Sequence, residues 1–184
     1  MKINAGLLKA QDGRKGAGPL FRRAPVSALF ATWFGVGLLP FASGTWASLA
    51  TIPIVDAIYA ATGLYGLLAF CVVVGVLGIP ASWRVANVLQ KGDPSQVVVD
   101  EVAGQALALL AVYTFCPFAR TSLAFWAWVA AAFVLFRVLD VWKPGPIGWM
   151  ERLPGGLGIM MDDILAGFLE ALALAATLIL LYRR

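Results

Sequence analysis

Six apolar runs, joined by short polar connections, constrain the fold of this chain more than any other feature. A helix that crosses a bilayer needs about 17–25 apolar residues. Five of the runs reach that length, whereas the first, which ends at Pro40, is too short and suits a re-entrant helix buried in protein. We therefore predict an all-α, polytopic membrane helical bundle with about five spans and a short N-terminal re-entrant helix. The six runs cover residues 26–40, 46–62, 64–82, 102–118, 122–139 and 164–182.

The amino-acid composition supports a membrane setting. Hydrophobic residues make up 61% of the 184 residues and charged residues 13%, about half the share found in soluble domains. Six of the fourteen Lys and Arg residues lie in the first 23 positions. Such a basic block is typical of a cytoplasmic segment that faces anionic lipids, and it does not indicate nucleic-acid binding. We expect residues 1–25 to form this segment and residues 26–184 to form one membrane-embedded domain.

Two tight connections orient the predicted helices. The Thr62–Gly63 turn and residues 117–121 each predict a helical hairpin, which brings the loops around residues 83–99 and 140–161 to the side of the basic N-terminal segment. Arg120 and the C-terminal Arg183–Arg184 pair are left on the other side. Because cytoplasmic loops are enriched in Lys and Arg, the richer side is predicted to face the cytoplasm, although the C-terminal pair opposes this orientation.

Five carboxylates lie at the ends of the apolar runs, all on the predicted cytoplasmic side. Acidic side chains at such positions are costly and by default mark a functional site. The structural alternative is that acids at helix N-termini only complement the helix dipole. The chain has no His, and ligands that are all oxygen suit Mg²⁺ or Mn²⁺ rather than Zn²⁺. We predict Mg²⁺ as the cofactor, with five ligands: Asp100, Glu101, Asp140, Asp162 and Asp163.

Two cations flank the middle acid. Arg137, Asp140 and Lys143 are spaced three residues apart and so share one face of a helix, which Pro144 is expected to end. A plain interfacial ion pair is the structural alternative. The acids outnumber these cations by about three charges, an excess that repels phosphate unless divalent cations bind. We therefore predict that Arg137 and Lys143 bind phosphate, and that these two cations, Asp140 and Asp100 are catalytic.

Segments with small residues adjoin the acids. Ser43, Gly44 and Thr45 precede the second apolar run and are predicted to offer backbone N–H groups and hydroxyls to phosphate, although such a segment is often only a turn. Gly104 and Ala166 each follow an acidic pair by three residues, which predicts the close approach of a neighbouring helix. No Walker A or dinucleotide-binding motif occurs, so nucleotide binding is not indicated.

These same motifs resemble the phosphatidylglycerophosphatase A family. The resemblance spans about residues 27–182 and implies a Mg²⁺-dependent lipid phosphatase of the bacterial inner membrane. Such enzymes convert phosphatidylglycerophosphate, a phospholipid, to phosphatidylglycerol and inorganic phosphate. The resemblance also implies that the acids and cations named above form the active site. The segments that carry it are PFASGTWASL at 40–49, VVDEVAG at 98–104, FRVLDVWKPGPI at 136–147 and GGLGIMMDDILAG at 155–167.

The residues independently exclude other phosphatase classes. No His is available as a nucleophile, and the Arg that a cysteine phosphatase needs six residues after its Cys is replaced by Leu77 and Ser122. Water activated by a metal is therefore the leading mechanism, with an aspartyl-phosphate on Asp140 or Asp100 as the alternative. A membrane transporter for a cation or a phosphorylated solute is the main competitor, but transporter sites lie near the midplane rather than at one interface.

Overall fold

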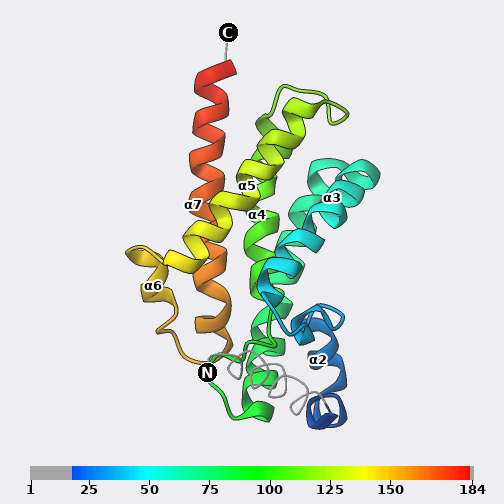
Figure 1. Cartoon of the computed structure of the whole chain (residues 1–184), viewed down its shortest axis with the longest axis vertical. Coiled ribbons are helices and arrows are strands. Elements are labelled where there is room, and N and C mark those ends of the chain that lie inside the picture. The colour runs from blue at the N-terminus through cyan, green and yellow to red at the C-terminus, as the bar shows by residue number, and fades with distance from the viewer. Residues whose placement is uncertain (1–17, 183–184) are drawn as a thin grey trace, which may run out of the picture.

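The computed structural model describes residues 18–182, and every regular element in that range is helical, which confirms the all-α prediction (Figure 1). The predicted basic segment is described only from residue 18 onward, where residues 18–23 are helical. Its first four cations and the C-terminal Arg pair lie outside the described residues. The other elements are α2 (Pro25–Ala31), η1 (Val36–Leu38), α3 (Ser43–Leu89), α4 (Val99–Phe115), α5 (Leu123–Trp142), α6 (Pro146–Met150) and α7 (Gly156–Tyr182).

The first apolar run forms two short helices instead of the single helix that was predicted. α2 and η1 are separated by Trp33, Phe34 and Gly35, whose φ angles are all positive. A right-handed helix cannot continue through such angles, so the run breaks at its middle.

α3 is a helical hairpin rather than one long helix. Gly63 has φ 67° and ψ −157°, a conformation that a residue without a Cβ adopts at little cost. The chain reverses there, and the two arms of α3 run in opposite directions (Figure 1). The predicted hairpin at Thr62–Gly63 is therefore confirmed, and its second arm continues past the expected residue 82 to Leu89.

α5 continues three residues beyond the apolar run that predicts it and carries Asp140 in its last turn. It ends, as expected, at Lys143, which takes a left-handed conformation before Pro144. The short helix α6, which follows directly, was not predicted.

α7 begins eight residues before its predicted start, so Asp162 and Asp163 lie inside the helix and not in its first turn. The glycines at its start have low helix propensity, but tertiary packing overrides this weak preference. A Cβ added to Gly156 would overlap the backbone carbonyl of Ile79 on α3. The helix dipole therefore does not explain the acidic pair of α7, because its effect fades beyond the first turn.

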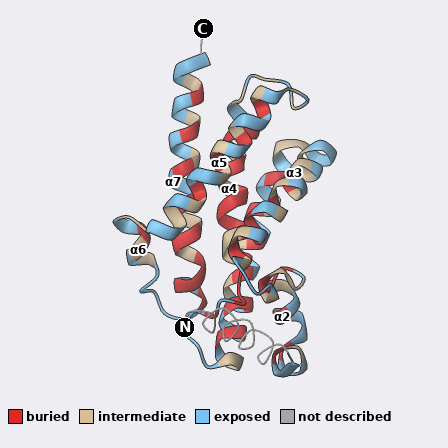
Figure 2. Ribbon diagram, in the orientation of Figure 1, coloured by how far each residue is buried: buried red, intermediate tan, exposed pale blue. Residues whose placement is uncertain are grey.

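α4 is the central helix, and most of its residues are buried (Figure 2). It packs most extensively against α7 and α3. Gly104 of α4 and Gly167 of α7 meet so closely that a Cβ on either would overlap backbone atoms of the other helix. The predicted close approach at Gly104 is confirmed, and Ala166 is also completely buried.

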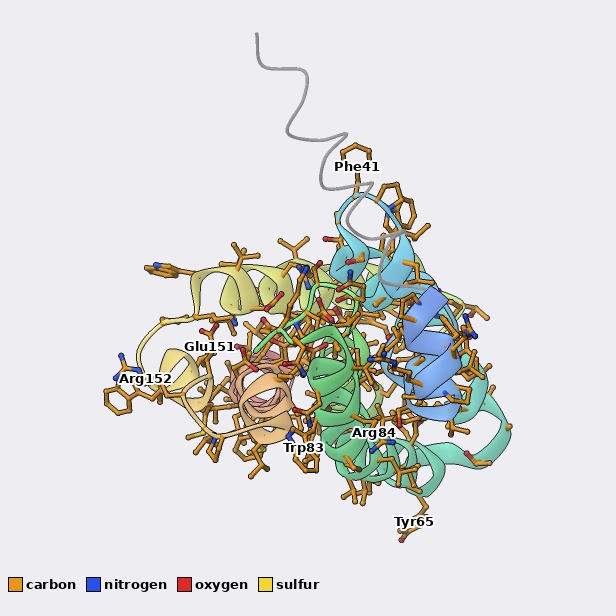
Figure 3. The ribbon with its side chains drawn as sticks, turned by 90° about the horizontal axis from the view of Figure 1, so that it is seen from below. Phe41, Tyr65, Trp83, Arg84, Glu151 and Arg152 are labelled. Atoms are coloured by element: carbon orange, nitrogen blue, oxygen red, sulfur yellow. The ribbon has the colours of Figure 1, made fainter. Side chains whose placement is uncertain are left out.

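The acidic motifs share one end of the bundle. The start of α3, the connection between α3 and α4, and the connection between α5 and α7 all lie at the lower end of the molecule (Figure 1). Glu151 and Arg152 lie together on one side of the molecule in the view from below, away from Arg84 (Figure 3). The Gly63 turn, the connection between α4 and α5, and the end of α7 lie at the opposite end (Figure 1).

Candidate metal and phosphate site

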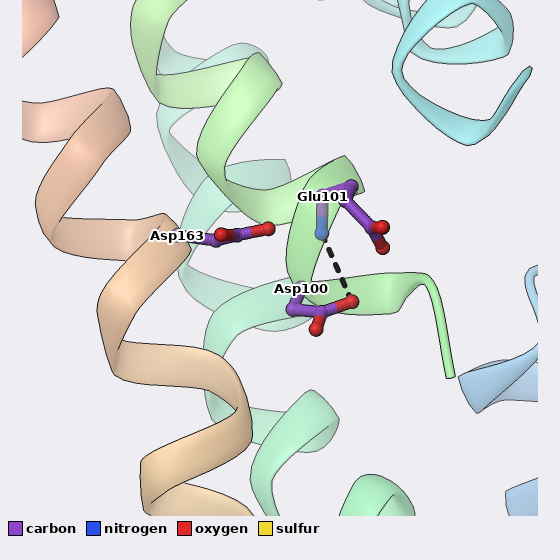
Figure 4. Close-up of side chains that lie close together, drawn as sticks. All are labelled: Asp100, Glu101 and Asp163. Atoms are coloured by element: carbon purple, nitrogen blue, oxygen red, sulfur yellow. Dashed lines mark hydrogen bonds between the residues drawn. The ribbon is translucent and has the colours of Figure 1, made fainter. Parts of the chain in front are cut away.

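Three carboxylates from two helices meet where α4 begins beside α7 (Figure 4). Asp100 and Glu101 lie in the first turn of α4, and Asp163 faces them from α7. One oxygen from each lies within 4.8 Å of the others. The backbone N–H of Glu101 donates to Asp100 Oδ1 at 3.1 Å, which holds the Asp100 side chain near its neighbour.

The donors of this cluster fit a divalent cation. Ligands of an octahedral Mg²⁺ are about 3.0 Å apart when adjacent and about 4.2 Å apart when opposite. The three carboxylate oxygens, which all lie within 4.8 Å of one another, are close enough to share one such ion. Glu101 Oε2 is buried and has no hydrogen-bond partner within the described part of the chain. Like charges packed this closely repel one another, so the arrangement favours a bound cation. We call Asp100, Glu101 and Asp163 the acidic cluster.

Glycines set the distances within the acidic cluster. A Cβ on Gly44, at the start of α3, would overlap the carboxylate of Glu101. A Cβ on Gly104 would overlap the Asp163 carbonyl and the ring of Phe136. These contacts hold α3 against α4 and α4 against α7, so that the acids of α4 and α7 can meet. The sequence context of Gly44 did not predict this role.

Asp140 adjoins the acidic cluster from α5. Its carboxyl group is close enough to that of Asp163 for the two to interact directly. Arg137 Nη1 lies 2.7 Å from Asp140 Oδ2, so the spacing along the helix correctly predicted that the two share a face. Four of the five predicted metal ligands are thus brought together, and Arg137 lies beside them.

Asp162, the fifth predicted ligand, is engaged by a cation. Lys143 Nζ donates to Asp162 Oδ2 at 2.6 Å and lies 3.6 Å from Glu151 Oε2. Burial lowers the pKa of Lys143, but the hydrogen bond and the negative charges of Asp162 and Glu151 raise it by more. The net pKa is above its usual value, so the amine stays charged. Lys143 therefore contacts Asp162 and Glu151, whereas Arg137 contacts Asp140; the sequence analysis predicted both cations at one phosphate.

Two pockets lined in part by charged side chains flank the acids. One, of about 240 Å³, is lined by Ser43, Gly44, Glu101 and Arg137. The Ser43 hydroxyl donates to the carbonyl of Ser95 at 3.1 Å. Thr45, which was predicted with its two neighbours to bind phosphate, instead lines an adjoining apolar groove.

The second pocket, of about 300 Å³, is bounded by acids that the sequence analysis did not single out. Asp93 and Glu151 line it together with Asp162. Asp93 precedes Pro94 in the loop before α4, and Glu151 follows α6, so both occupy connections that the apolar pattern treats as linkers.

Buried polar side chains continue from the site into the bundle. Ser48, Gln105 and Glu170 are fully or almost fully buried, and each has side-chain atoms without a hydrogen-bond partner within residues 18–182. Glu170 lies two turns after Asp163 on the same face of α7. Its position in the middle of an apolar run is the signal that could have identified it from the sequence.

Asp56 belongs to a separate group of interacting side chains. No charged residue lies near Asp56 along the chain, whereas in the fold Arg120 Nη1 lies 2.8 Å from Asp56 Oδ1. The hydroxyl of Tyr113 donates to the same oxygen at 3.0 Å. These groups join α3 to the connection after α4 at the end of the bundle opposite the site.

Comparisons with known proteins point to one family. The sequence profile of the family described as phosphatidylglycerophosphatase A matches residues 29–178. The chain is 40% identical to the Escherichia coli K12 phosphatidylglycerophosphatase A over 146 residues, which cover 78% of each protein. It is 34% identical to the Haemophilus influenzae protein of the same name, over 80% of this chain and 86% of that one.

A third relative carries a different name. The chain is 40% identical to a candidate phosphatidylinositol-3-phosphatase of Bacteroides thetaiotaomicron, over 80% of this chain and 90% of that protein. No solved structure matches the chain significantly. The extent of the profile match and the identity to the two phosphatidylglycerophosphatases lead to one assignment. The chain belongs to the phosphatidylglycerophosphatase A family.

Proposed function

We propose that this phosphatase removes the terminal phosphate of phosphatidylglycerophosphate, in a reaction that depends on Mg²⁺. The family supports the substrate. The observation that carries the Mg²⁺ dependence is the acidic cluster, whose carboxylates come together at the edge of a pocket lined by Arg137. Acids gathered at one end of the bundle suit an enzyme at the membrane surface better than a transporter site at the midplane.

The site residues take distinct roles in this proposal. Asp100, Glu101, Asp140 and Asp163 would hold Mg²⁺, which supplies a Lewis acid for the phosphoryl oxygens and activates water as a nucleophile. Arg137 would bind the phosphate oxygens in the pocket that it shares with Ser43 and stabilise the charge that develops there.

The chemistry is a hydrolysis. The water oxygen forms a bond to phosphorus, the phosphorus–oxygen ester bond breaks, and the alkoxide that leaves takes up a proton to give phosphatidylglycerol. In this proposal Asp140 or Asp100 would accept the proton of the water. The alternative in which one of them attacks phosphorus directly predicts a covalent aspartyl-phosphate. Lys143 acts at a distance in this scheme, because it holds Asp162 beside the acidic cluster.

We infer five membrane spans, formed by the two arms of α3 and by α4, α5 and α7. Among the described helices, α3, α5 and α7 are long and apolar enough to cross a membrane by length and composition. Exposed aromatic side chains at both ends of the bundle fit two membrane–water interfaces. At the site end these are Trp46, Trp83, Trp142 and Trp149, and at the other end Tyr65, Trp126 and Tyr182.

The site end is proposed to face the cytoplasm of a bacterium, with the chain in the inner membrane. Among residues 18–182, Arg120 is the one Lys or Arg at the opposite end. Cytoplasmic ends of membrane proteins carry the excess of basic residues. Residues 25–38, with their two short helices, would form the re-entrant segment on this side.

Phosphate release from a panel of lipid phosphates tests the proposal. The purified protein is assayed in detergent with phosphatidylglycerophosphate, phosphatidylinositol 3-phosphate and phosphatidic acid, each with Mg²⁺ and with a chelator. We expect the highest kcat/KM for phosphatidylglycerophosphate and no turnover with the chelator. Full activity after chelation would refute the Mg²⁺ dependence. A higher kcat/KM for phosphatidylinositol 3-phosphate would refute phosphatidylglycerophosphate as the preferred substrate.

A further inference from the structure

Arg137 lines two adjoining cavities of opposite character. On one side is the polar pocket with Ser43 and Glu101. On the other side is an apolar groove of about 560 Å³ between the start of α3 and α5, lined by Thr45, Phe133, Val134, Val138 and Val141. Its volume falls within the range of about 300–1,000 Å³ that is usual for ligand sites.

The groove follows a single face of α5. Val134, Arg137, Val138 and Val141 are spaced i, i+3, i+4 and i+7, so the guanidinium interrupts an otherwise apolar stripe. Val134 is 56% exposed and Val141 76% exposed, so the groove is open on its outer side. In the proposed orientation this outer side meets the lipid acyl chains.

We infer that this groove binds the acyl chains of the lipid substrate, which enters sideways from the membrane with its phosphate at Arg137. This inference rests on the proposed function and adds a place for the apolar part of the substrate. A lipid phosphate carries an anion attached to hydrocarbon chains. The neighbouring pocket and groove match this arrangement, because the cation Arg137 lies next to an apolar surface.

A second apolar groove fits this ligand less well. It has a volume of about 400 Å³ and is lined by Ile79, Trp83 and Leu157. It shares Gly155 with the pocket whose charged lining consists of Asp93, Glu151 and Asp162. A phosphate that approached by this route would meet carboxylates first, so charge favours the groove at Arg137.

Filling each groove separately tests the inference. Val134→Trp narrows the groove at Arg137, and Leu157→Trp, also at an exposed apolar position, narrows the other groove and serves as the control. kcat/KM is measured for long-chain phosphatidylglycerophosphate and for its water-soluble deacylated head group. We expect Val134→Trp to lower the value for the long-chain lipid about tenfold, the usual effect of overpacking an apolar site. The head group should be hydrolysed at the wild-type rate, which also shows that the variant is folded.

A second readout does not require turnover. In a protein whose two cysteines are replaced by Ala, Val141→Cys is labelled with a membrane-soluble maleimide. Long-chain phosphatidylglycerophosphate should slow the labelling at least about fivefold more than phosphatidylcholine does, in line with the modest coupling typical between bound groups. If the lipid protects Val141→Cys from labelling but no phosphate is released, the groove still binds lipid and the proposed function is wrong.

Three outcomes would overturn the groove assignment. The first is that Val134→Trp lowers kcat/KM equally for the long-chain lipid and for the head group. The second is that only Leu157→Trp lowers kcat/KM for the long-chain lipid. The third is that the lipid does not protect Val141→Cys from labelling. A change in oligomeric state in Val134→Trp with unchanged kinetics would instead assign the surface to a second copy of the chain.

Discussion

Asp163 is the residue on which the site depends most. It is 3% exposed, lies opposite Asp100 and Glu101, and is near enough to interact directly with Asp140. A carboxylate buried among three others is retained only where a cation balances the charge or a function requires it. In the proposed site the metal would therefore lie between α4 and α7 at Asp163, whereas Asp162 already has Lys143 as its partner.

Neutralising single acids gives the first prediction. Asp163→Asn and Asp140→Asn keep the side-chain shape but remove a ligand charge, so kcat should fall at least about 100-fold at saturating Mg²⁺. Asp56→Asn, at the other end of the bundle, should keep most of the activity. The ligand role is wrong for Asp140 if the folded Asp140→Asn variant keeps more than about a tenth of the wild-type kcat.

The pair formed by Lys143 and Asp162 gives the second prediction. The Asp162 side chain is 6% exposed and the Lys143 side chain 26%, so Lys143→Met leaves a buried charge without its partner. The free energy of unfolding should fall by about 3 kcal/mol. The double variant Lys143→Met/Asp162→Asn should regain about half of the lost free energy of unfolding, because it contains no unpaired buried charge at this position. Additive losses in detergent unfolding would show that the two side chains are not coupled.

At the scale of the helices, the crossing of α4 and α7 positions the proposed metal ligands. Gly104 lies three residues after Glu101, and Gly167 four residues after Asp163. Because these glycines bring the backbones into contact, the acids one turn earlier are held within reach of one cation. The same crossing fixes the position of α4, most of whose residues are buried.

Adding a methyl group at this crossing gives the third prediction. Gly104→Ala forces the Cβ into the Asp163 carbonyl and the Phe136 ring, so the free energy of unfolding should fall by about 1–3 kcal/mol and activity should fall with it. Gly75→Ala is the matched control, since its Cβ would make an ordinary contact of 3.6 Å with Ile164. That variant should be neutral or up to about 1 kcal/mol more stable. Equal stability of the two variants would refute the close crossing.

The helices were largely predictable from the sequence, but their ends were not. Hydrophobic runs locate helices because burial or a membrane requires apolar surface, and they correctly located the hairpin in α3. The end of α5 at Lys143 was correctly predicted from Pro144 rather than from the apolar run. The hydrophobic runs failed at the start of α7, where glycines with low propensity are held helical by α3, and at Trp33–Gly35, where the run turns. Both outcomes depend on tertiary contacts that a local pattern does not contain.

At the scale of the whole molecule, the site residues converge because every second connection returns the chain to the same end. The two hairpins therefore predicted that acids scattered between residues 100 and 163 share one surface. Which acids pair with which cations was not predictable. The partners of Asp162 and Asp56 are 19 and 64 positions away in the chain, and only the folded geometry selects them.

The orientation of the molecule gives the fourth prediction. Single cysteines are placed at Gly92, near the site, and at Tyr65, which is 86% exposed near the Gly63 turn, in a background without Cys71 and Cys116. An impermeant thiol reagent added to intact cells should label Tyr65→Cys and spare Gly92→Cys, because the basic end faces the cytoplasm. Labelling of Gly92→Cys but not of Tyr65→Cys would show that the site faces the outside of the cell.

The central claim, that the acidic cluster holds a divalent cation, is tested most directly by metal binding itself. Mn²⁺ binding to the purified protein is followed by electron paramagnetic resonance and competed with Mg²⁺. Wild type should bind Mn²⁺, and Asp163→Asn should bind it at least about tenfold more weakly. Glu170→Gln, which alters another buried acid on the same face of α7, should bind it as wild type does. Equal affinity of wild type and Asp163→Asn would contradict the account.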